Sequence, residues 1–139
     1  MYGPQESDEL EERKDFYDKV SIEIEKAQNV GDRVMIIGDM NAKLDHDTEG
    51  QIVPESGNGK FLVDTVTEYD LDVVNLSDRC RGKWTWSKNI LGVNHRSRLD
   101  YLIVDHHVFD YVLEMEIDEE RTLCPFHKKK KKKKKKKVL

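Results

Sequence analysis

Residues 33–42 contain the pattern that most constrains the fold: a short apolar run followed directly by a glycine, an acid and an amide. Val34–Ile37 is unbroken and rich in β-branched side chains, which predicts a strand buried on both faces. Because strand side chains alternate, Asp39 and Asn41 are expected to point the same way at its carboxyl end. That edge of an α/β sheet is where ligands usually bind.

The side chains of Asp39 and Asn41 suit a phosphate group and its metal ion. A carboxylate can accept a proton from an attacking water, and a carboxamide can donate a hydrogen bond to a phosphoryl oxygen. The same residue types, next to Gly38, are also typical of an ordinary turn. Spacing alone does not separate these two interpretations.

The remaining segments predict an α/β arrangement. Apolar residues at helical spacing indicate a helix over about 8–29, ended by Gly31. Residues 43–59 are rich in glycine and acids and indicate a loop, and 60–69 indicate a second helix. Strands are expected at 71–76, 83–87 and 97–105, with a hairpin loop at 89–96 and a last strand within 112–117.

Two strands carry candidate functional residues. In Lys83–Ser87, one of the two tryptophans is expected to pack in the core or at a sheet edge. The other, with Trp86 as the candidate, is expected at the site, where an indole can stack on a sugar or base. Asp100 lies within an apolar strand, where an unpartnered charge would be costly, so a bonded partner and a functional role are expected. His106 and His107 are interpreted as exposed loop residues.

The charge of the chain is divided between two regions. Residues 128–137 are ten consecutive lysines. Without them the chain has 14 Lys and Arg and 28 Asp and Glu, a formal net charge of −14. An acidic protein of this kind is not expected to bind nucleic acid through electrostatic attraction alone. It remains compatible with a metal-dependent phosphodiesterase, whose bound cation reverses the local field.

Length and composition place the chain among single-domain proteins. It has 139 residues and 37% hydrophobic content, enough for one modest core. No segment reaches the roughly 18 apolar residues of a membrane span, and none resembles a signal peptide. We therefore expect an intracellular protein without membrane contact, in the nucleus or cytoplasm, with Cys80 and Cys124 as reduced thiols.

The end of the chain is expected to be a separate segment. We predict a domain over residues 1–127 and a disordered poly-lysine tail over 128–139, because ten like charges repel one another. The tail could be a nucleic-acid-binding arm or the translation of an A-tract. The uninterrupted homopolymer favours the second interpretation.

Three motifs together resemble the endonuclease/exonuclease/phosphatase superfamily, to which DNase I belongs. They are Gly38-Asp39-Met40-Asn41-Ala42, Trp84-Thr85-Trp86-Ser87 and Ser97-Arg98-Leu99-Asp100-Tyr101, in that family's order and at comparable spacing. The opening Tyr2-Gly3-Pro4 is similar to the family's Tyr-x-Pro segment. The residues that make up these motifs are most similar to those of endonucleases of non-LTR retrotransposons, a group that includes the craniofacial development protein 2-like proteins.

This resemblance implies a role for each matching residue. Asp39 would orient or deprotonate the attacking water and contribute to metal binding, and Asn41 would hold a phosphate oxygen. Asp100 would orient a histidine, and Tyr2 would donate toward the scissile phosphate. The implied cofactor is Mg²⁺ or Mn²⁺, which would neutralise charge on the leaving oxygen, and the implied partner is DNA.

The departures from the family pattern are equally specific. The chain starts at the Tyr-x-Pro segment, so the resemblance covers only the C-terminal half, and the N-terminal metal-binding residues have no counterpart. The closing Ser-Asp-His element is also absent, and His127 lies in a different context. Loss of one member of a cooperating catalytic set costs several orders of magnitude in rate. We therefore expect a fragment with little or no activity.

The implied fold is α/β: a partial two-sheet β-sandwich flanked by helices, lacking its N-terminal half. Such a half-sandwich exposes an apolar sheet face that the missing half or another protein should cover. Two other functions remain open. The same motifs serve phosphatases of small phosphorylated molecules, and the chain could be a non-catalytic remnant.

Overall fold

The structure, a computed structural model, describes residues 1–120 and contains both helices and strands, the strands forming small sheets. The elements follow one another in the order α1 (Leu10–Asn29), β1 (Met35–Asp39), β2 (Leu44–His46), β3 (Ile52–Pro54), α2 (Gly57–Glu68), β4 (Leu71–Val73), the 3-10 helix η1 (Val74–Leu76), β5 (Cys80–Arg81), β6 (Trp86–Ile90), β7 (Val93–Ser97), β8 (Asp100–Asp105), α3 (His106–Tyr111) and β9 (Met115–Glu116). The predicted tail 128–139, Cys124 and His127 lie outside the described residues.

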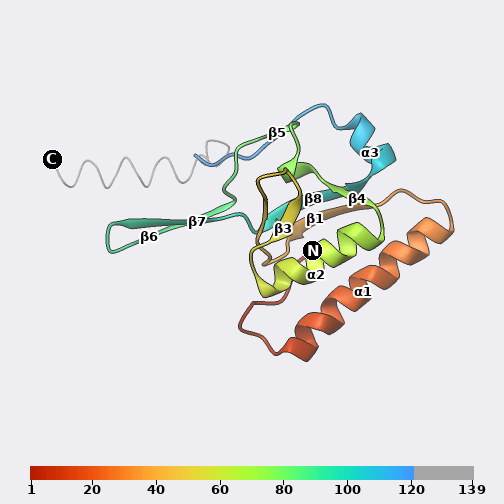
Figure 1. Cartoon of the computed structure of the whole chain (residues 1–139), viewed down its shortest axis with the longest axis horizontal. Coiled ribbons are helices and arrows are strands. Elements are labelled where there is room, and N and C mark those ends of the chain that lie inside the picture. Colours follow the sequence, from red (N-terminus) through yellow and green to blue (C-terminus); the bar gives the residue numbers. More distant parts are fainter. Residues whose placement is uncertain (121–139) are drawn as a thin grey trace.

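The central sheet has three antiparallel strands in the order β1-β8-β4. Helices α1 and α2 lie together on one side of this sheet (Figure 1). Strand β8 is the middle strand and pairs with β1 along its whole length, from Met35 opposite Val104 to Asp39 opposite Asp100. The expectation of a mixed α/β fold is therefore confirmed at this level.

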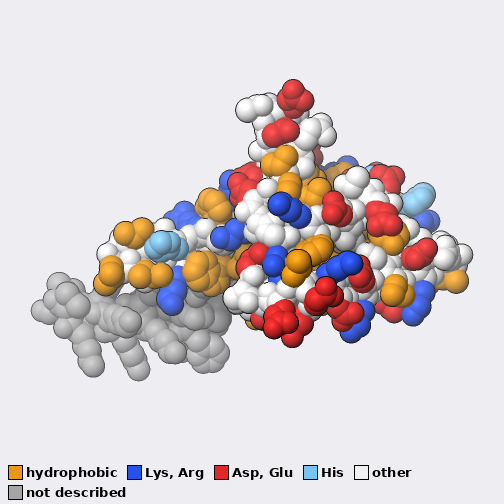
Figure 2. Space-filling view, turned by 60° about the horizontal axis from the view of Figure 1, so that its bottom comes forward, with side chains coloured by type: hydrophobic (Ala, Val, Ile, Leu, Met, Phe, Trp, Pro, Cys, Tyr) orange, Lys and Arg blue, Asp and Glu red, His pale blue; other side chains and the backbone are white. Residues whose placement is uncertain are grey.

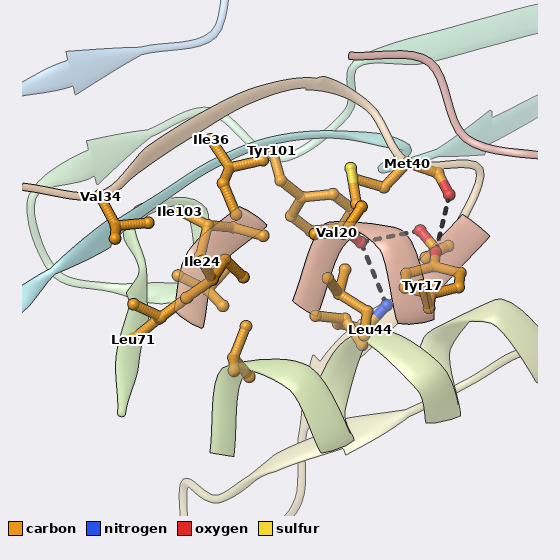
Figure 3. Packing of buried hydrophobic residues seen from close by; sticks show 14 residues of the cluster. Tyr17, Val20, Ile24, Val34, Ile36, Met40, Leu44, Leu71, Tyr101 and Ile103 are labelled. Carbon is orange, nitrogen blue, oxygen red and sulfur yellow. Dashed lines mark hydrogen bonds between the residues drawn. The ribbon is translucent and has the colours of Figure 1, made fainter. Parts of the chain in front are cut away.

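One hydrophobic core fills the space between the sheet and the two helices. Helix α1 contributes Tyr17, Val20 and Ile24, which recur at helical spacing and are the buried residues of that helix. The sheet contributes alternate residues, including Ile36 and Ile103, which face each other across β1 and β8. Figure 3 shows these side chains converging from helix and sheet.

Helix α1 ends as its sequence predicts. Gly31 has φ of 76°, and its N–H donates to the carbonyl of Gln28 while Asp32 donates to that of Ala27. These two bonds form a Schellman motif, in which glycine tolerates the left-handed conformation. The predicted stop at Gly31 is confirmed.

Strand β1 is buried on one face only, so the prediction of burial on both faces is wrong. Val34 and Ile36 face the helices, whereas Met35 and Ile37 are 61% and 66% exposed. Within the described residues no second layer packs over these two side chains. An unbroken apolar run therefore shows that both faces of the strand carry apolar side chains. It does not by itself show that other parts of the protein cover both faces.

Other boundaries also differ from the prediction. The loop expected at 43–59 contains the β2–β3 hairpin, and α2 begins earlier because Ser56 caps it, its Oγ accepting from the Gly59 N–H at 3.0 Å. The expected loop at 89–96 is mostly paired strand, since β6 and β7 form a hairpin that projects from the body (Figure 1). Residues 106–111 form α3 and not a loop.

The two tryptophans differ in exposure. Trp84 is half-buried, which is compatible with packing at an edge, and Trp86 is 40% exposed; neither is among the fully buried residues. Both lie at the base of the β6–β7 hairpin, which has no covering layer in the described part of the chain. Cys80 is a free thiol, and none of the described helices has the length and apolar character needed to cross a membrane.

Candidate functional site

The N-terminal segment lies against the end of β1 and brings Tyr2 to Asp39. Tyr2 and Asp39 form a parallel bridge, and the Gly3 N–H donates to the Asp39 carbonyl at 2.6 Å. The segment passes so close to β1 that a Cβ at Gly38 would overlap the carbonyl of Met1. Glycine at position 38 therefore permits the contact that places Tyr2 beside the acid.

Asp39 and Asp100 stand opposite each other in β1 and β8. The Met40 N–H donates to the Leu99 carbonyl at 2.8 Å, just beyond this pair, which makes it a non-hydrogen-bonded pair. In such pairs the Cα atoms are about 4.5 Å apart and the side chains approach most closely. Two acids that are sixty-one positions apart in the chain thus share one face of the sheet.

Neither carboxylate is neutralised by a basic side chain among residues 1–120. One oxygen of Asp39 accepts the Asn41 N–H at 2.9 Å, and its second oxygen has no donor within the described part of the chain. The Asp100 carboxylate makes no hydrogen bond or ion pair in this part of the chain; its backbone binds Thr85 and Asn75 instead. The expectation that Asp100 has a bonded partner is thus not met here.

Asn41 occupies a strained position at the start of the loop after β1. Its φ is 45°, a left-handed conformation that asparagine tolerates better than most residues. The bond from its N–H to Asp39 is the Asx type that stabilises turns, so the motif is also the turn that its composition indicates. Its side-chain amide donates to the Gly3 carbonyl at 2.7 Å, which leaves one amide hydrogen for another acceptor.

Strand alternation is not what places Asn41 near Asp39. Strand β1 ends at Asp39, and the chain then turns. The two side chains come together because of this turn and because of the Gly3 contact. The sequence reasoning anticipated the proximity but assigned it to the wrong cause.

Buried side chains hold the loop after β1 from below. The Tyr17 hydroxyl donates to the Met40 carbonyl at 3.1 Å, and the Tyr101 hydroxyl accepts the Leu44 N–H at 3.2 Å and lies 3.0 Å from the Ala42 carbonyl. Figure 3 shows both tyrosines directed at this segment. Burial raises the pKa of each phenol well above its usual range, so both hydroxyls stay protonated and hold the loop at any ordinary pH.

Asn58 completes the support and was missed from the sequence. It is fully buried at the start of α2, and its amide donates to the carbonyls of Pro4 (2.8 Å) and Asn41 (3.1 Å). Its side-chain oxygen accepts from Arg13 at 2.8 Å, and its backbone N–H donates to Glu6 at 2.7 Å. A polar residue between two glycines at a helix start was the available signal.

A hollow of about 430 Å³ lies over this arrangement. Four of the five candidate residues from the sequence line this hollow: Tyr2, Asp39, Asn41 and Trp86. Asp100 is not part of its lining but lies opposite Asp39 in the adjoining strand. Lys43, which the sequence reasoning did not select, supplies a positive charge at the rim.

The donor set has the chemistry of a hard cation site without being a complete cage. Carboxylate oxygens are the ligands that Mg²⁺ prefers, and Mg²⁺ commonly binds through one or two carboxylates with waters and substrate phosphates. No group of three or more His, Cys, Asp or Glu that could hold a metal ion occurs among residues 1–120. Models of known protein families, curated proteins and solved structures yielded no match to this chain.

Proposed function

We propose that this chain is part of a divalent-metal-dependent phosphodiester endonuclease of the retrotransposon type, acting on DNA, with little or no activity by itself. The observation that carries the proposal is the juxtaposition of Asp39 and Asp100 beside the hollow that Tyr2, Asn41 and Trp86 border. The motif resemblance links these residues to phosphate chemistry, and their placement agrees with that link.

Asp39 would hold the cation, and Asp100, directly opposite it in β8, would be a second ligand. The fit is supported by the two carboxylates themselves, which face each other without a neutralising cation in residues 1–120. When bound, Mg²⁺ or Mn²⁺ neutralises charge that builds up on the leaving oxygen. A protein-bound cation would also relieve the repulsion between the two acids.

The other residues would act on the phosphate and on the water. The free oxygen of Asp39 would orient or deprotonate the attacking water, since its other oxygen is committed to Asn41. The remaining amide hydrogen of Asn41 would donate to a non-bridging phosphate oxygen. Tyr2, whose hydroxyl accepts from Gln5 at 3.1 Å, would donate its own proton toward the phosphate, and Trp86 would stack on a sugar or base.

The sheet supports a partial DNase I-like sandwich as the fold. One face of β1 packs on the helices, while Met35 and Ile37 form an uncovered apolar strip on the other. A second sheet, or another protein, would bury these side chains, as the resemblance implies. Exposed apolar strips of this kind mark interaction surfaces.

Metal binding tests the site without requiring turnover. Mn²⁺ titrated into the full chain and followed by electron paramagnetic resonance should bind at one site, and Asp39→Ala should abolish that binding. Asp18→Ala, which removes an exposed acid from α1, is the matched control and should bind as wild type does. Equal binding by all three proteins would remove Asp39 from the metal site.

Catalysis is tested with supercoiled DNA at high protein concentration and long incubation. Slow Mg²⁺-dependent nicking that Asp39→Ala abolishes would support the endonuclease and exclude a non-catalytic remnant. Hydrolysis of inositol phosphates without DNA nicking would favour the phosphatase alternative, which the acidic balance of −14 outside the lysine run makes worth testing. Nicking that survives Asp39→Ala would contradict the assigned role.

A further inference from the structure

A second hollow, of about 190 Å³, adjoins the first and has a different charge. Four basic side chains border it, Lys43, Lys83, Arg96 and Arg98, together with the carboxylates of Asp45 and Glu55. Lys43 and Ser97 line both hollows. This concentration of positive charge contrasts with the strongly acidic remainder of the described chain.

The sequence shows the same contrast along the chain. Residues 83–99 contain four Lys and Arg and no Asp or Glu. They form the β6–β7 hairpin and its base, and Figure 2 shows hydrophobic and basic side chains gathered on this projection while red acidic ones are spread over the body. A basic segment in an acidic protein marks a place where a negatively charged group can approach.

Arg98 is the most informative residue of this second hollow. It is only 8% exposed, and its guanidinium donates to the carbonyls of Lys83 (3.3 Å) and Leu44 (3.1 Å). It forms no ion pair with any carboxylate of residues 1–120. Its charge acts on the Asp45 carboxylate without a salt bridge between them. A guanidinium has five N–H donors, and the two carbonyls do not use them all, so Arg98 keeps donors for an anion.

Two acids, Asp45 and Glu55, also border this hollow, and neither forms a salt bridge with Arg98 among the described residues. Asp45 is committed to Lys83, with the ammonium 3.1 Å from its carboxylate. The backbone N–H of His46 and this lysine hold the pKa of Asp45 below its ordinary value, so the pair stays ionised at neutral pH. Arg96 and Lys43 are exposed and form no salt bridge among the described residues. Arg96 also borders a hollow that Glu119 lines, and its charge acts on that carboxylate.

We propose that this second hollow is a phosphate-binding subsite, formed by Arg98, Arg96 and Lys43, that holds a phosphate next to the one in the Asp39 hollow. Arginine is suited to this role because its planar fork matches phosphate oxygens. The inference rests on the proposed function and deepens it: two adjoining phosphate sites that share Lys43 fit a polynucleotide strand. A free phosphate ion offers the same chemistry, so the test has to separate the two.

A site-resolved binding measurement is needed because the ten lysines also attract phosphates. The full chain, labelled with ¹⁵N, is titrated in EDTA with the dinucleotide d(TpTp) and, separately, with inorganic phosphate. The signals to follow are the Arg96 and Arg98 Nε–H groups and the Lys43 and Ser97 amides. The dinucleotide should shift all of them, and should bind at least tenfold more tightly than inorganic phosphate.

Variants connect the shifts to the subsite. Arg96→Gln and Lys43→Gln, both at exposed positions that leave the core intact, should each weaken dinucleotide binding roughly five- to tenfold, as expected for loss of a charge-assisted hydrogen bond. Lys14→Gln removes the same charge from the exposed face of α1 and should change nothing. Arg98 itself is left unchanged because its carbonyl contacts also support the fold.

Three results would overturn the subsite. The first is the absence of shifts at these groups, and the second is an equal effect of Arg96→Gln and Lys14→Gln on dinucleotide binding. The third is equal affinity for the dinucleotide and inorganic phosphate, which would indicate a site for free phosphate only. The titrations are made in EDTA, so they do not depend on a metal ion at Asp39. Failure of Mn²⁺ binding at Asp39 therefore counts against the proposed function and not against this subsite.

Discussion

Asp39 and Asp100 are a directly opposed, non-hydrogen-bonded pair in antiparallel strands β1 and β8, the geometry in which two side chains lie closest. Like charges at such positions destabilise a sheet. Neither acid has a basic partner among residues 1–120. We therefore expect the two carboxylates to repel each other, and we expect a bound cation, or removal of one charge, to relieve this repulsion.

Asp100→Asn should stabilise the protein in the absence of divalent metal. Removing one of two opposed charges is expected to increase the free energy of unfolding by about 0.2–1 kcal/mol at low salt, measured by urea unfolding at pH 7. Mg²⁺ should stabilise the wild type, because it binds the folded pair, and should have less effect on the variant. Asp18→Asn, at an exposed position of α1, is the control; a less stable Asp100→Asn would show that the pair is not repulsive.

Asn58→Ala should be strongly destabilising. The substitution leaves the carbonyls of Pro4 and Asn41 and the Arg13 guanidinium without their buried partner, at a cost on the order of 3 kcal/mol. Thermal and urea unfolding measure the loss. Asn89→Ala, on the exposed hairpin, should change stability by under about 0.5 kcal/mol. Similar effects at both positions would mean that the network of Asn58 does not support the fold.

His106 should make stability fall as pH rises above 6.5, the ordinary pKa of an imidazole. Its ring lies 2.5 Å from Asp72 and 2.9 Å from Asp70, and these carboxylates, Asp72 first, raise the pKa of the imidazole above its ordinary value of 6.5. The stabilisation is fully present below that value and is lost as pH rises through the raised pKa. Urea midpoints measured from pH 5.5 to 9 should fall across this window.

The variant His106→Gln should remove that fall, since glutamine does not titrate. His95→Gln, on the exposed hairpin strand β7, should retain the wild-type pH profile. A wild-type midpoint that is flat across the window, or one that rises with pH, would contradict the ion pair between His106 and the two acids.

Ile36→Thr and Ile37→Thr should have very different effects on stability although the residues are neighbours. Ile36 is 7% exposed and faces the core, so threonine there should cost roughly 2–4 kcal/mol of stability. Ile37 is 66% exposed, so threonine should change stability little but reduce self-association, because it interrupts the apolar strip. Sedimentation velocity and urea unfolding separate these effects; a strongly destabilised Ile37→Thr would mean that its face is covered.

Sequence patterns located the main elements because those signals are local. The spacing of Tyr17, Val20 and Ile24 sets which face of α1 is buried, and Gly31 ends that helix through a bond pattern confined to six residues. The β6–β7 hairpin was misread as a loop because Leu91, at its turn, has φ of 50°, where glycine or asparagine is the usual signal. Its strands also lack a buried face, so they show no alternation to detect.

By itself, the sequence determined the helices, the apolar strands and the candidate acids, since propensity and periodicity are properties of neighbouring residues. It could not determine that one face of β1 has no cover in the described chain, because an apolar side chain looks the same whether covered or not. Only the tertiary structure decided that Asp39 meets Asp100, that Asn58 holds Asn41, and that Arg98 is buried against the carbonyls of Lys83 and Leu44. Those relationships depend on strand register and packing between segments far apart in the chain, which no local pattern encodes.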